Sequence, residues 1–294
     1  MSAFKCGLIA IVGRPNVGKS TLLNRLVGFK LSIISSRPQT TRHKILGVLS
    51  EAERQFVFVD TPGYQQRHRS ALNRLMNKQI QSALAEVDVV LWLIDARRLT
   101  AEDRELIPLL PASRPVILAM NKVDALSDRN RLLPLIDSVR KLHPFAEIVP
   151  ISAESGDNIE ALKNAVAAYL PDAPAMFDTD TVTDRSERFL AAEYVREKLF
   201  RRLGEEIPYG TAVQIERFEQ DGGQRRIAAV IWVDRLAHKR IVIGQGGEVL
   251  KAVASAARRD MEENFGGKVF LEVWVKVKSG WADNERAALS LSGE

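Results

Sequence analysis

The chain has 294 residues, a length that predicts two domains of ordinary size. Hydrophobic residues make up 46% of it and charged residues 27%, so a globally disordered chain is excluded. Charges interrupt the longest apolar runs well short of the roughly 20 residues that span a bilayer, and we expect no transmembrane helix. The single cysteine, Cys6, has no disulfide partner within the chain, which fits a reducing cytoplasm.

The formal net charge of +5 indicates an anionic partner without naming one. Residues 1–50 contain no Asp or Glu, as suits a segment that wraps a triphosphate. Acids and bases are nearly balanced in the C-terminal part, so a uniform basic coat is excluded there. A local basic cluster surrounds a glycine loop and consists of Arg235, Lys239, Arg240, Lys251, Arg258 and Arg259.

Up to residue 170, short apolar runs alternate with helical patterns. The runs are rich in Val and Ile and apolar on both faces, as buried parallel strands are. They are Leu8–Val12, Phe56–Val59, Val89–Ile94, Val116–Met120 and Ile148–Ile151. Helical patterns follow Gly18 and cover residues 72–85 and 159–170. This alternation predicts a doubly wound α/β fold with a mostly parallel sheet, whose ligand binds at the carboxyl ends of the strands.

Residues 173–186 carry acids and threonines with no apolar period. We expect them to link a first domain, residues 1–172, to a second, residues 187–294. The second domain shows a different pattern, which predicts an α+β fold. Its expected elements are a helix at 188–203, strands at 211–218 and 225–233 joined by a DGG hairpin, a helix at 248–265, a strand at 269–277 and a short helix at 283–292.

The segment GRPNVGKS at residues 13–20 matches the phosphate-loop pattern GxxxxGK[ST] in full. Its glycines allow a tight turn that points N–H groups at phosphates, and the helix that follows adds its positive end. We expect Lys19 to reach the β- and γ-phosphates and Ser20 to bind Mg²⁺. The residues expected to contact the nucleotide here are Gly13, Arg14, Pro15, Asn16, Val17, Gly18, Lys19, Ser20 and Thr21.

A second motif, Asp60-Thr61-Pro62-Gly63, follows the strand that ends at residue 59, and we expect all four residues to line the nucleotide site. Asp60 is expected to hold the metal through water. The Gly63 N–H is expected to contact the γ-phosphate and so to sense its loss.

A threonine in the polar stretch QTTRH at residues 39–43 would complete the Mg²⁺ shell when the γ-phosphate is present. We favour Thr41 and keep Thr40 as the alternative. Together with Lys19 and Gly63, Thr41 makes up the set that we expect to act in hydrolysis.

The motif Asn121-Lys122-Val123-Asp124 follows the strand that ends at residue 120. The Asp124 carboxylate accepts two hydrogen bonds from guanine N1–H and the 2-amino group, a donor pair that adenine lacks. Asn121 is expected to tie the loops together and Lys122 to lie along the base. Ser152 and Ala153 are expected to close over guanine O6 with a backbone N–H. Together with the phosphate loop, this motif predicts a GTP site.

The residue after DTPG bears on hydrolysis. Many GTPases place a water-orienting Gln there, whereas this chain has Tyr64, followed by Gln65 and Gln66. A tyrosine does not polarise water in that way. We therefore expect slow intrinsic hydrolysis, or help from an ion, another water-positioning group or a partner.

Gly244-Gln245-Gly246-Gly247 fits the pattern GxxG, follows the apolar run Ile241–Ile243 and opens a predicted helix. Such a loop suits a KH-type clamp, in which glycines let a nucleic-acid backbone approach. A protein-contact domain is the alternative. The residues expected to bind RNA are Lys239, Arg240, Ile243, Gly244, Gln245, Gly246, Gly247, Lys251 and Arg258.

Motifs along nearly the whole chain resemble those of the Era family of bacterial GTPases, which join a G domain to a C-terminal KH domain. Besides the motifs above, they include PQTTRH at 38–43, NRLMNK at 73–78, PISA at 150–153, IERF at 215–218, ARRDMEE at 257–263 and LEVWVKVKSGWADNERA at 271–287. The lack of Gln at position 64 agrees with this resemblance.

The resemblance implies rapid GDP/GTP exchange, slow hydrolysis and binding near the 3′ end of 16S rRNA. It also implies a role in maturation of the 30S ribosomal subunit and some peripheral association of this cytoplasmic protein with the inner membrane. Asn16 matches a phosphate-loop Asn that binds K⁺ in related GTPases. We expect the protein to be a monomer.

Two other functions stay open at this point. The first is a largely non-catalytic rRNA-binding scaffold that uses GTP as a structural ligand. The second is a tRNA-modifying GTPase, which shares the phosphate loop. We rank it low, because the C-terminal cysteine expected for its folate-type chemistry is absent, Cys6 being the only cysteine.

Overall fold

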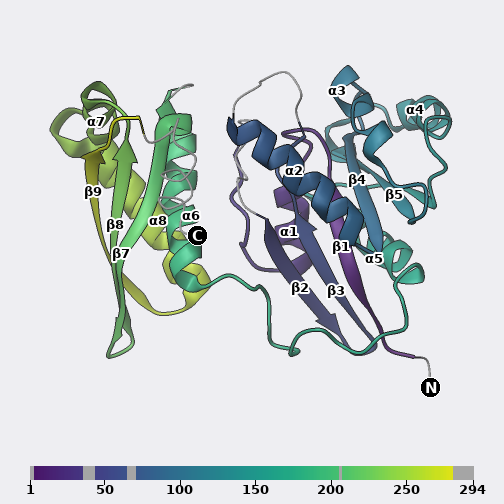
Figure 1. The fold of residues 1–294 in the computed structure, drawn as a ribbon, viewed down its shortest axis with the longest axis horizontal. Coiled ribbons are helices and arrows are strands. Elements are labelled where there is room, and N and C mark those ends of the chain that lie inside the picture. The colour runs from purple at the N-terminus through teal and green to yellow at the C-terminus, as the bar shows by residue number, and fades with distance from the viewer. Residues whose placement is uncertain (1–2, 36–43, 65–70, 205–206, 281–294) are drawn as a thin grey trace. The chain divides into compact units, whose positions relative to one another are not determined.

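The computed structural model describes residues 3–35, 44–64, 71–204 and 207–280 (Figure 1). The chain divides into two compact units. Unit 1 consists of Met1–Ser32 and Arg37–Asp184, and unit 2 of Ile33–Ser36 and Arg185–Glu294. In the described part of the chain, no helix has both the length and the apolar character needed to cross a bilayer.

The sheet of unit 1 has the strand order β2-β3-β1-β4-β5-β6. Its strands are β1 (Lys5–Val12), β2 (Ile45–Glu51), β3 (Arg54–Asp60), β4 (Val89–Asp95), β5 (Val116–Asn121) and β6 (Glu147–Pro150). All neighbours pair in parallel except β2, which is antiparallel to β3. The predicted mostly parallel sheet is confirmed, and each predicted strand lies within one residue of an observed one or inside it.

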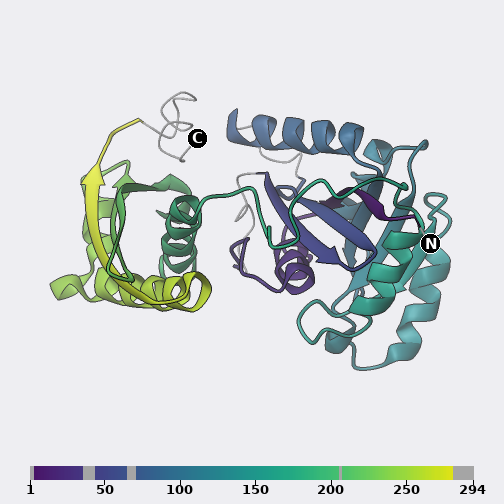
Figure 2. The ribbon, with the colours of Figure 1, turned by 90° about the horizontal axis from the view of Figure 1, so that it is seen from below.

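Helices cover both faces of this sheet, with α2 on one face and α1 and α5 on the other (Figure 2). The helices of unit 1 are α1 (Lys19–Val27), α2 (Ala71–Glu86), α3 (Ala101–Arg104), α4 (Leu132–Val139) and α5 (Ile159–Ala168), with single 3-10 turns at Ile107–Leu109, Val123–Ala125 and Arg129–Arg131. Because both faces are covered, central strands are buried throughout, and all seven residues of β4 are buried. The doubly wound fold is confirmed.

Strand β2 was not predicted from the sequence. It lies at the edge of the sheet, so only some of its residues are buried and its apolar run is less regular. Its outer edge is covered by residues that we expected to belong to the linker. The Val48 N–H donates to Val182 O at 2.9 Å, and Thr183 Oγ1 donates to Leu46 O at 2.7 Å. In the described chain, residues up to Asp184 thus belong with unit 1.

Unit 2 is an α+β unit with a sheet of order β7-β8-β9. Its elements are α6 (Glu187–Arg202), a 3-10 turn at Ile207–Gly210, β7 (Thr211–Asp221), β8 (Gln224–Val233), α7 (Leu236–Ile243), a 3-10 turn at Gln245–Gly247, α8 (Glu248–Phe265) and β9 (Lys268–Val277). Strands β7 and β8 are antiparallel, and β9 joins β8 in parallel. The predicted α+β fold is confirmed. The predicted helix at 283–292 lies outside the described residues.

The apolar run Ile241–Ile243 ends helix α7, which we did not predict. The glycine loop therefore connects two helices, α7 and α8. In Figure 1, α6 and α8 lie on one side of the sheet of unit 2. Tyr194, Phe200 and Met261 from these two helices are fully buried in unit 2.

Candidate functional site

The phosphate loop joins β1 to α1 at the carboxyl end of β1. Gly18 has a φ of 104°, and a Cβ atom at this position would lie 2.2 Å from Nδ2 of Asn121. Asn16 also lies in the left-handed region, with a φ of 63°. Gly18 has no side chain to cap α1, so the N-terminus of this helix is suited to an anion.

Lys19 lies beneath this loop with only 6% of its surface exposed. Its Nζ donates to Gly13 O at 3.0 Å and to Arg14 O at 3.1 Å. Burial lowers the pKa of Lys19 to about 8, although the nearby charge of Asp60 opposes the shift. A polyphosphate beside the loop would favour the charged ammonium. Lys19 Nζ thus lies against carbonyl groups of the phosphate loop, where it would meet the phosphates of a nucleotide.

Asp60, at the end of β3, is fully buried. Its Oδ2 accepts from Ser20 Oγ at 3.2 Å and from Ser32 Oγ at 2.6 Å. Its Oδ1 is buried and has no hydrogen-bond partner among the described residues. Burial raises the pKa of Asp60, despite the hydrogen bond from Ser32. A buried carboxylate beside a hydroxyl fits a hard divalent cation such as Mg²⁺.

Apart from Ser20, Asp60 and the predicted Thr41, the ligands of a Mg²⁺ ion here would be water and phosphate oxygens, and not a cluster of carboxylates. Within the described ranges, no group of three or more His, Cys, Asp or Glu residues is placed to hold a metal. Mg²⁺ usually keeps several waters and binds one or two protein groups together with substrate phosphates. Sequence reasoning missed Ser32. Its only signal is a small polar residue in an otherwise apolar run, which is not specific.

Gly63 and Tyr64 pack directly on the phosphate loop. A Cβ atom on Gly63 would lie 2.8 Å from Cγ of Pro15, and the Tyr64 N–H donates to Gly13 O at 3.4 Å. The Tyr64 side chain is 6% exposed and belongs to the core beside Ile80. A buried phenol does not replace a water-orienting glutamine.

Asn121 connects three loops of the site. Its Nδ2 donates to Val17 O at 2.7 Å, and its Oδ1 accepts from the Ala153 N–H at 2.9 Å. Since that N–H already donates to Asn121, a hydrogen bond from Ala153 to guanine O6 would have to be bifurcated between the two acceptors. Ser152 is buried, and its N–H donates to Asp157 O at 3.1 Å.

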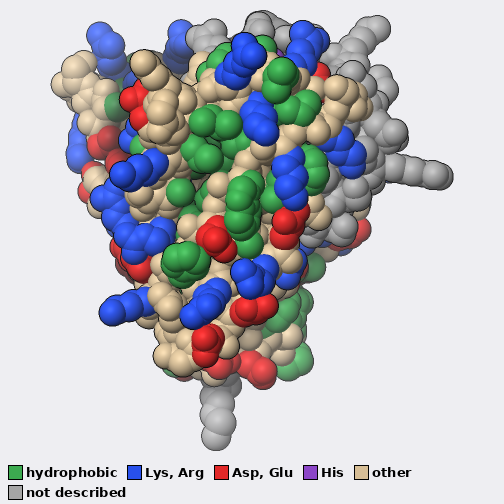
Figure 3. Space-filling view, turned by 90° about the vertical axis from the view of Figure 1, so that its left-hand side faces the viewer, with side chains coloured by type: hydrophobic (Ala, Val, Ile, Leu, Met, Phe, Trp, Pro, Cys, Tyr) green, Lys and Arg blue, Asp and Glu red, His purple; other side chains and the backbone are tan. Residues whose placement is uncertain are grey.

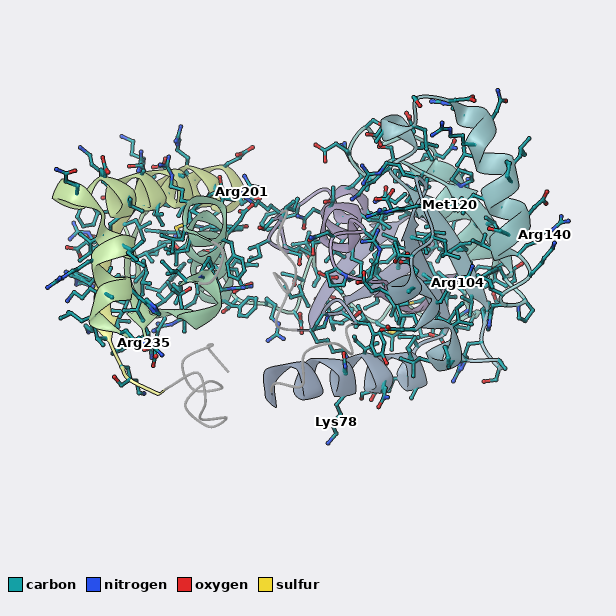
Figure 4. The ribbon with its side chains drawn as sticks, turned by 90° about the horizontal axis from the view of Figure 1, so that it is seen from above. Lys78, Arg104, Met120, Arg140, Arg201 and Arg235 are labelled. Atoms are coloured by element: carbon teal, nitrogen blue, oxygen red, sulfur yellow. The ribbon has the colours of Figure 1, made fainter. Side chains whose placement is uncertain are left out.

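The two charged residues of the NKVD motif lie at the surface of this site. Lys122 has a φ of 69°, and its Nζ donates to Asn16 O at 2.6 Å, so the guanine loop touches the phosphate loop. Asp124 is exposed, and its carboxylate is thus accessible to a base. Met120, labelled in Figure 4, is fully buried just before Asn121 and anchors the motif in the sheet.

Arg25 of α1 is a further residue that sequence reasoning missed. Its Nε donates to Ala153 O at 3.2 Å, and its guanidinium also contacts Glu154 O. It thereby holds the loop after β6 beside α1. The predicted switch residues Thr40 and Thr41 lie outside the described residues.

The glycine loop of unit 2 is open to solvent. Gly244 has a φ of 77°, and a Cβ atom there would lie 2.5 Å from Cγ2 of Val249, so the close turn into α8 requires glycine. Gly246 and Gly247 also have positive φ, but the space where a Cβ would lie is empty. Gln245 and Gly246 are exposed. A polymer backbone thus has room to approach this loop.

Cations and apolar side chains flank the loop. No ion pair forms on Lys239, Arg240 or Lys251 in the described part of the chain, whereas Arg258 pairs with Glu262 at 2.6 Å. Leu236 and Ile241 of α7 are 59% and 49% exposed. Figure 3 shows hydrophobic side chains gathered between basic ones on the face of unit 2 that carries β9. Basic groups beside exposed apolar side chains suit a nucleic acid whose bases leave the stack.

Known protein families match a part of each unit. The family described as "50S ribosome-binding GTPase" matches residues 8–122, and the family described as "KH domain" matches residues 206–282. GTPase Era of Nitrosomonas eutropha is 51% identical over 293 residues, which cover 100% of this chain and 99% of that protein. GTPase Era of Chromobacterium violaceum is 53% identical over 283 residues, 96% of each chain.

The chain belongs to the Era family of GTPases. It is a GTP hydrolase that takes a guanine nucleotide with Mg²⁺. Two solved structures match with a TM-score of 0.94 at 40% identity and cover 99% of both chains. One is a tyrosine-to-alanine variant of Aquifex aeolicus Era bound to GDP·AlF4⁻. The other is Era in complex with MgGDPNP and nucleotides 1506–1542 of 16S ribosomal RNA.

Proposed function

We propose that this GTPase binds the 3′ region of 16S rRNA under the control of its nucleotide, as a factor in 16S rRNA processing and 30S subunit biogenesis. The observation that carries the proposal is that one chain holds two sites. One is a guanine-nucleotide site whose loops are joined by hydrogen bonds, and the other is an open GxxG loop with basic flanks. The complex of Era with MgGDPNP and 16S nucleotides supports it.

In the nucleotide site, the phosphate loop binds the phosphates and the NKVD loop selects guanine. The contacting residues are Gly13, Arg14, Pro15, Asn16, Val17, Gly18, Lys19, Ser20, Thr21, Asp60, Thr61, Pro62, Gly63, Asn121, Lys122, Asp124, Ser152 and Ala153. Ser20, Thr41 and, through water, Asp60 would hold Mg²⁺, which supplies charge neutralisation at the phosphates. Asn16 is our candidate ligand for K⁺.

Hydrolysis in this proposal is slow. Lys19 stabilises charge on the γ-phosphate, Thr41 and Gly63 report its presence, and the buried Tyr64 supplies no amide to orient water. Slow hydrolysis of GTP would then set how long the protein stays in its GTP-bound state, and rapid turnover is not expected. The alternative, an rRNA-binding scaffold with GTP as a structural ligand, predicts no stimulated turnover. Single-turnover hydrolysis measured with and without small subunits separates the two.

The RNA surface consists of the glycine loop and its flanks, namely Lys239, Arg240, Ile243, Gly244, Gln245, Gly246, Gly247, Lys251 and Arg258. We expect Lys251→Gln to weaken RNA binding about 3- to 10-fold and to lower the slope of log affinity against log salt by about 0.7, because one phosphate contact is lost. Lys268→Gln, at another exposed lysine, which begins β9, is the control. Equal losses in both variants would place the RNA elsewhere.

The decisive experiment measures binding of RNA from the 16S 3′ end in the presence of GTP, GDP or no nucleotide. Nucleotide control predicts affinities that differ between these states. Equal affinity in all three would refute it and leave only RNA binding.

The remaining parts of the proposal concern setting and organisation. The chain acts as a monomer in the cytoplasm on the 30S subunit, with some peripheral association with the inner membrane. Its domains are residues 1–172 and 187–294, and the connecting segment, residues 173–186, packs on the first domain as far as Asp184. Sedimentation of the purified chain, and of cell fractions with and without 30S subunits, tests these statements.

A further inference from the structure

Two buried carboxylates outside the nucleotide motifs hold cations of both nucleotide loops. The first is Asp95, the last residue of β4, whose side chain is 3% exposed. Its Oδ2 lies 2.6 Å from a terminal nitrogen of Arg97, 3.5 Å from Lys122 Nζ and 4.0 Å from a terminal nitrogen of Arg14. Thus Asp95 joins one cation of the phosphate loop to one of the guanine loop.

The second carboxylate, Asp103, is fully buried in the short helix α3. Its Oδ2 accepts from the Thr100 N–H at 2.8 Å, and its own N–H donates to Thr100 Oγ1 at 3.4 Å, which forms a capping box. Nε of Arg14 lies 3.2 Å from its Oδ1. The cap fixes the orientation of Asp103, and Asp103 in turn fixes the side chain of Arg14. In Figure 4, the labelled Arg104 marks this helix.

Both of these cations also act on the phosphate loop. Lys122 Nζ donates to Asn16 O at 2.6 Å, and a terminal nitrogen of Arg14 donates to Pro15 O at 3.3 Å. A continuous chain of ion pairs and hydrogen bonds therefore runs from the capped helix through Arg14 to Asp95, Lys122 and back to the loop. Buried charges of this kind are stabilising only when each is paired, so removal of one member leaves the others uncompensated.

We propose that Asp95 and Asp103 are positioning residues that hold the phosphate loop and the guanine loop at a fixed separation for the nucleotide. They need not touch the nucleotide themselves. The inference rests on the proposed nucleotide site. Although burial alone would raise the pKa of Asp95, hydrogen bonds from Arg97 and the charge of Lys122 lower it to about 2. The carboxylate thus keeps its charge at physiological pH.

The test uses the full chain and a fluorescent, ribose-labelled GDP, with affinity and dissociation rate as readouts. We expect Asp95→Asn to weaken GDP about 10-fold or more and Asp103→Asn about 5-fold, mainly through faster dissociation, because the loops separate more easily. Asp137→Asn, at an exposed carboxylate of α4 paired with Arg140, is the control and should change neither. Unchanged affinity in both variants would overturn the inference.

A double-mutant cycle of Arg14 and Asp103 distinguishes a positioning role of the ion pair from a general effect on packing. If the ion pair acts as proposed, Arg14→Gln combined with Asp103→Asn binds GDP no more weakly than either single variant, and Arg14→Lys retains more affinity than Arg14→Gln. Additive losses, or equal affinity of the Lys and Gln variants, would refute the role of the pair. Asp124→Asn, run in the same assay, tests the guanine site itself. If only that variant weakens GDP, the site stands and this inference fails.

Discussion

Two glycine loops of this protein open onto helices, one in each unit, and they are built in opposite ways. The phosphate loop of unit 1 is packed, since a Cβ on Gly18 would lie 2.2 Å from Asn121, and one on Gly63 would lie 2.8 Å from Pro15. The GxxG loop of unit 2 is packed only at Gly244, and Gly246 and Gly247 face empty space. One loop is closed by protein on its outer side, and the other is open.

The difference agrees with what each loop is proposed to bind. A nucleotide is small and is read by many short contacts, so the loops around it must be held in place before it arrives. A nucleic-acid strand is a polymer whose backbone needs room to run past, so the loop that clamps it has to stay accessible. The same residue type therefore serves close packing in unit 1 and open access in unit 2.

The strongest test of this contrast replaces one glycine in each loop. In Gly18→Ala, the new methyl group collides with an Asn121 side chain that Val17 O and Ala153 N–H already fix. We expect GDP affinity to fall at least about 100-fold, which is about 2.7 kcal/mol. Gly246→Ala meets no atom and should cost only about 1 kcal/mol of backbone strain, with GDP affinity unchanged. Titration calorimetry and thermal unfolding of both variants measure this, and similar GDP losses would break the contrast.

A smaller effect is expected at the guanine carboxylate. Asp124→Asn replaces an acceptor of two hydrogen bonds by a group that both donates and accepts. We expect GTP affinity to fall about 10- to 100-fold and affinity for xanthosine triphosphate to rise, because xanthine offers the matching acceptor. Asp137→Asn is the control carboxylate. Unaltered GTP affinity in the first variant would show that the base is read elsewhere.

The smallest effect concerns Lys19, the buried lysine of the phosphate loop. Burial lowers the pKa of Lys19 from 10.5 to about 8, so between these pH values the unfolded chain holds a proton that the folded chain has lost. The cost of the buried ammonium is therefore complete below pH 8, and stability rises as pH increases through that window.

Denaturant unfolding near pH 7.5 and pH 9.5 measures this contribution. Relative to Lys19→Met, the wild-type chain should gain on the order of 1 kcal/mol over that interval. A difference between the wild type and Lys19→Met that is the same at both pH values would mean that the folded chain does not perturb this lysine.

Much of the fold was predictable because local pattern and tertiary structure agree. The central strands are buried on both faces, so they are continuous apolar runs in the sequence, as in β4 and β5. Strand β2 escaped prediction because an edge strand is only partly buried. Helix α7 escaped it because its apolar run of three branched residues, Ile241–Ile243, resembles a strand as much as a helical turn.

The motifs predicted which residues gather at the nucleotide site, and the sheet brings them to one edge. Residues without a motif were not predictable. Ser32 reaches Asp60, Arg25 reaches Ala153, and Asp103 reaches Arg14, over sequence separations from 28 to 128 residues. No local pattern records such contacts, since they depend on which loops the fold places side by side.

By itself, the sequence determined which chemistry to expect of this protein: a loop suited to phosphates, a carboxylate suited to guanine and a GxxG loop with basic flanks. These depend on residue type and short spacing, which the chain records directly. Only the tertiary structure decided how the loops are held. The connection of Asp95 and Asp103 to Arg14 and Lys122 exists because parallel strands end at one edge of the sheet, where low exposure makes each ion pair depend on the others.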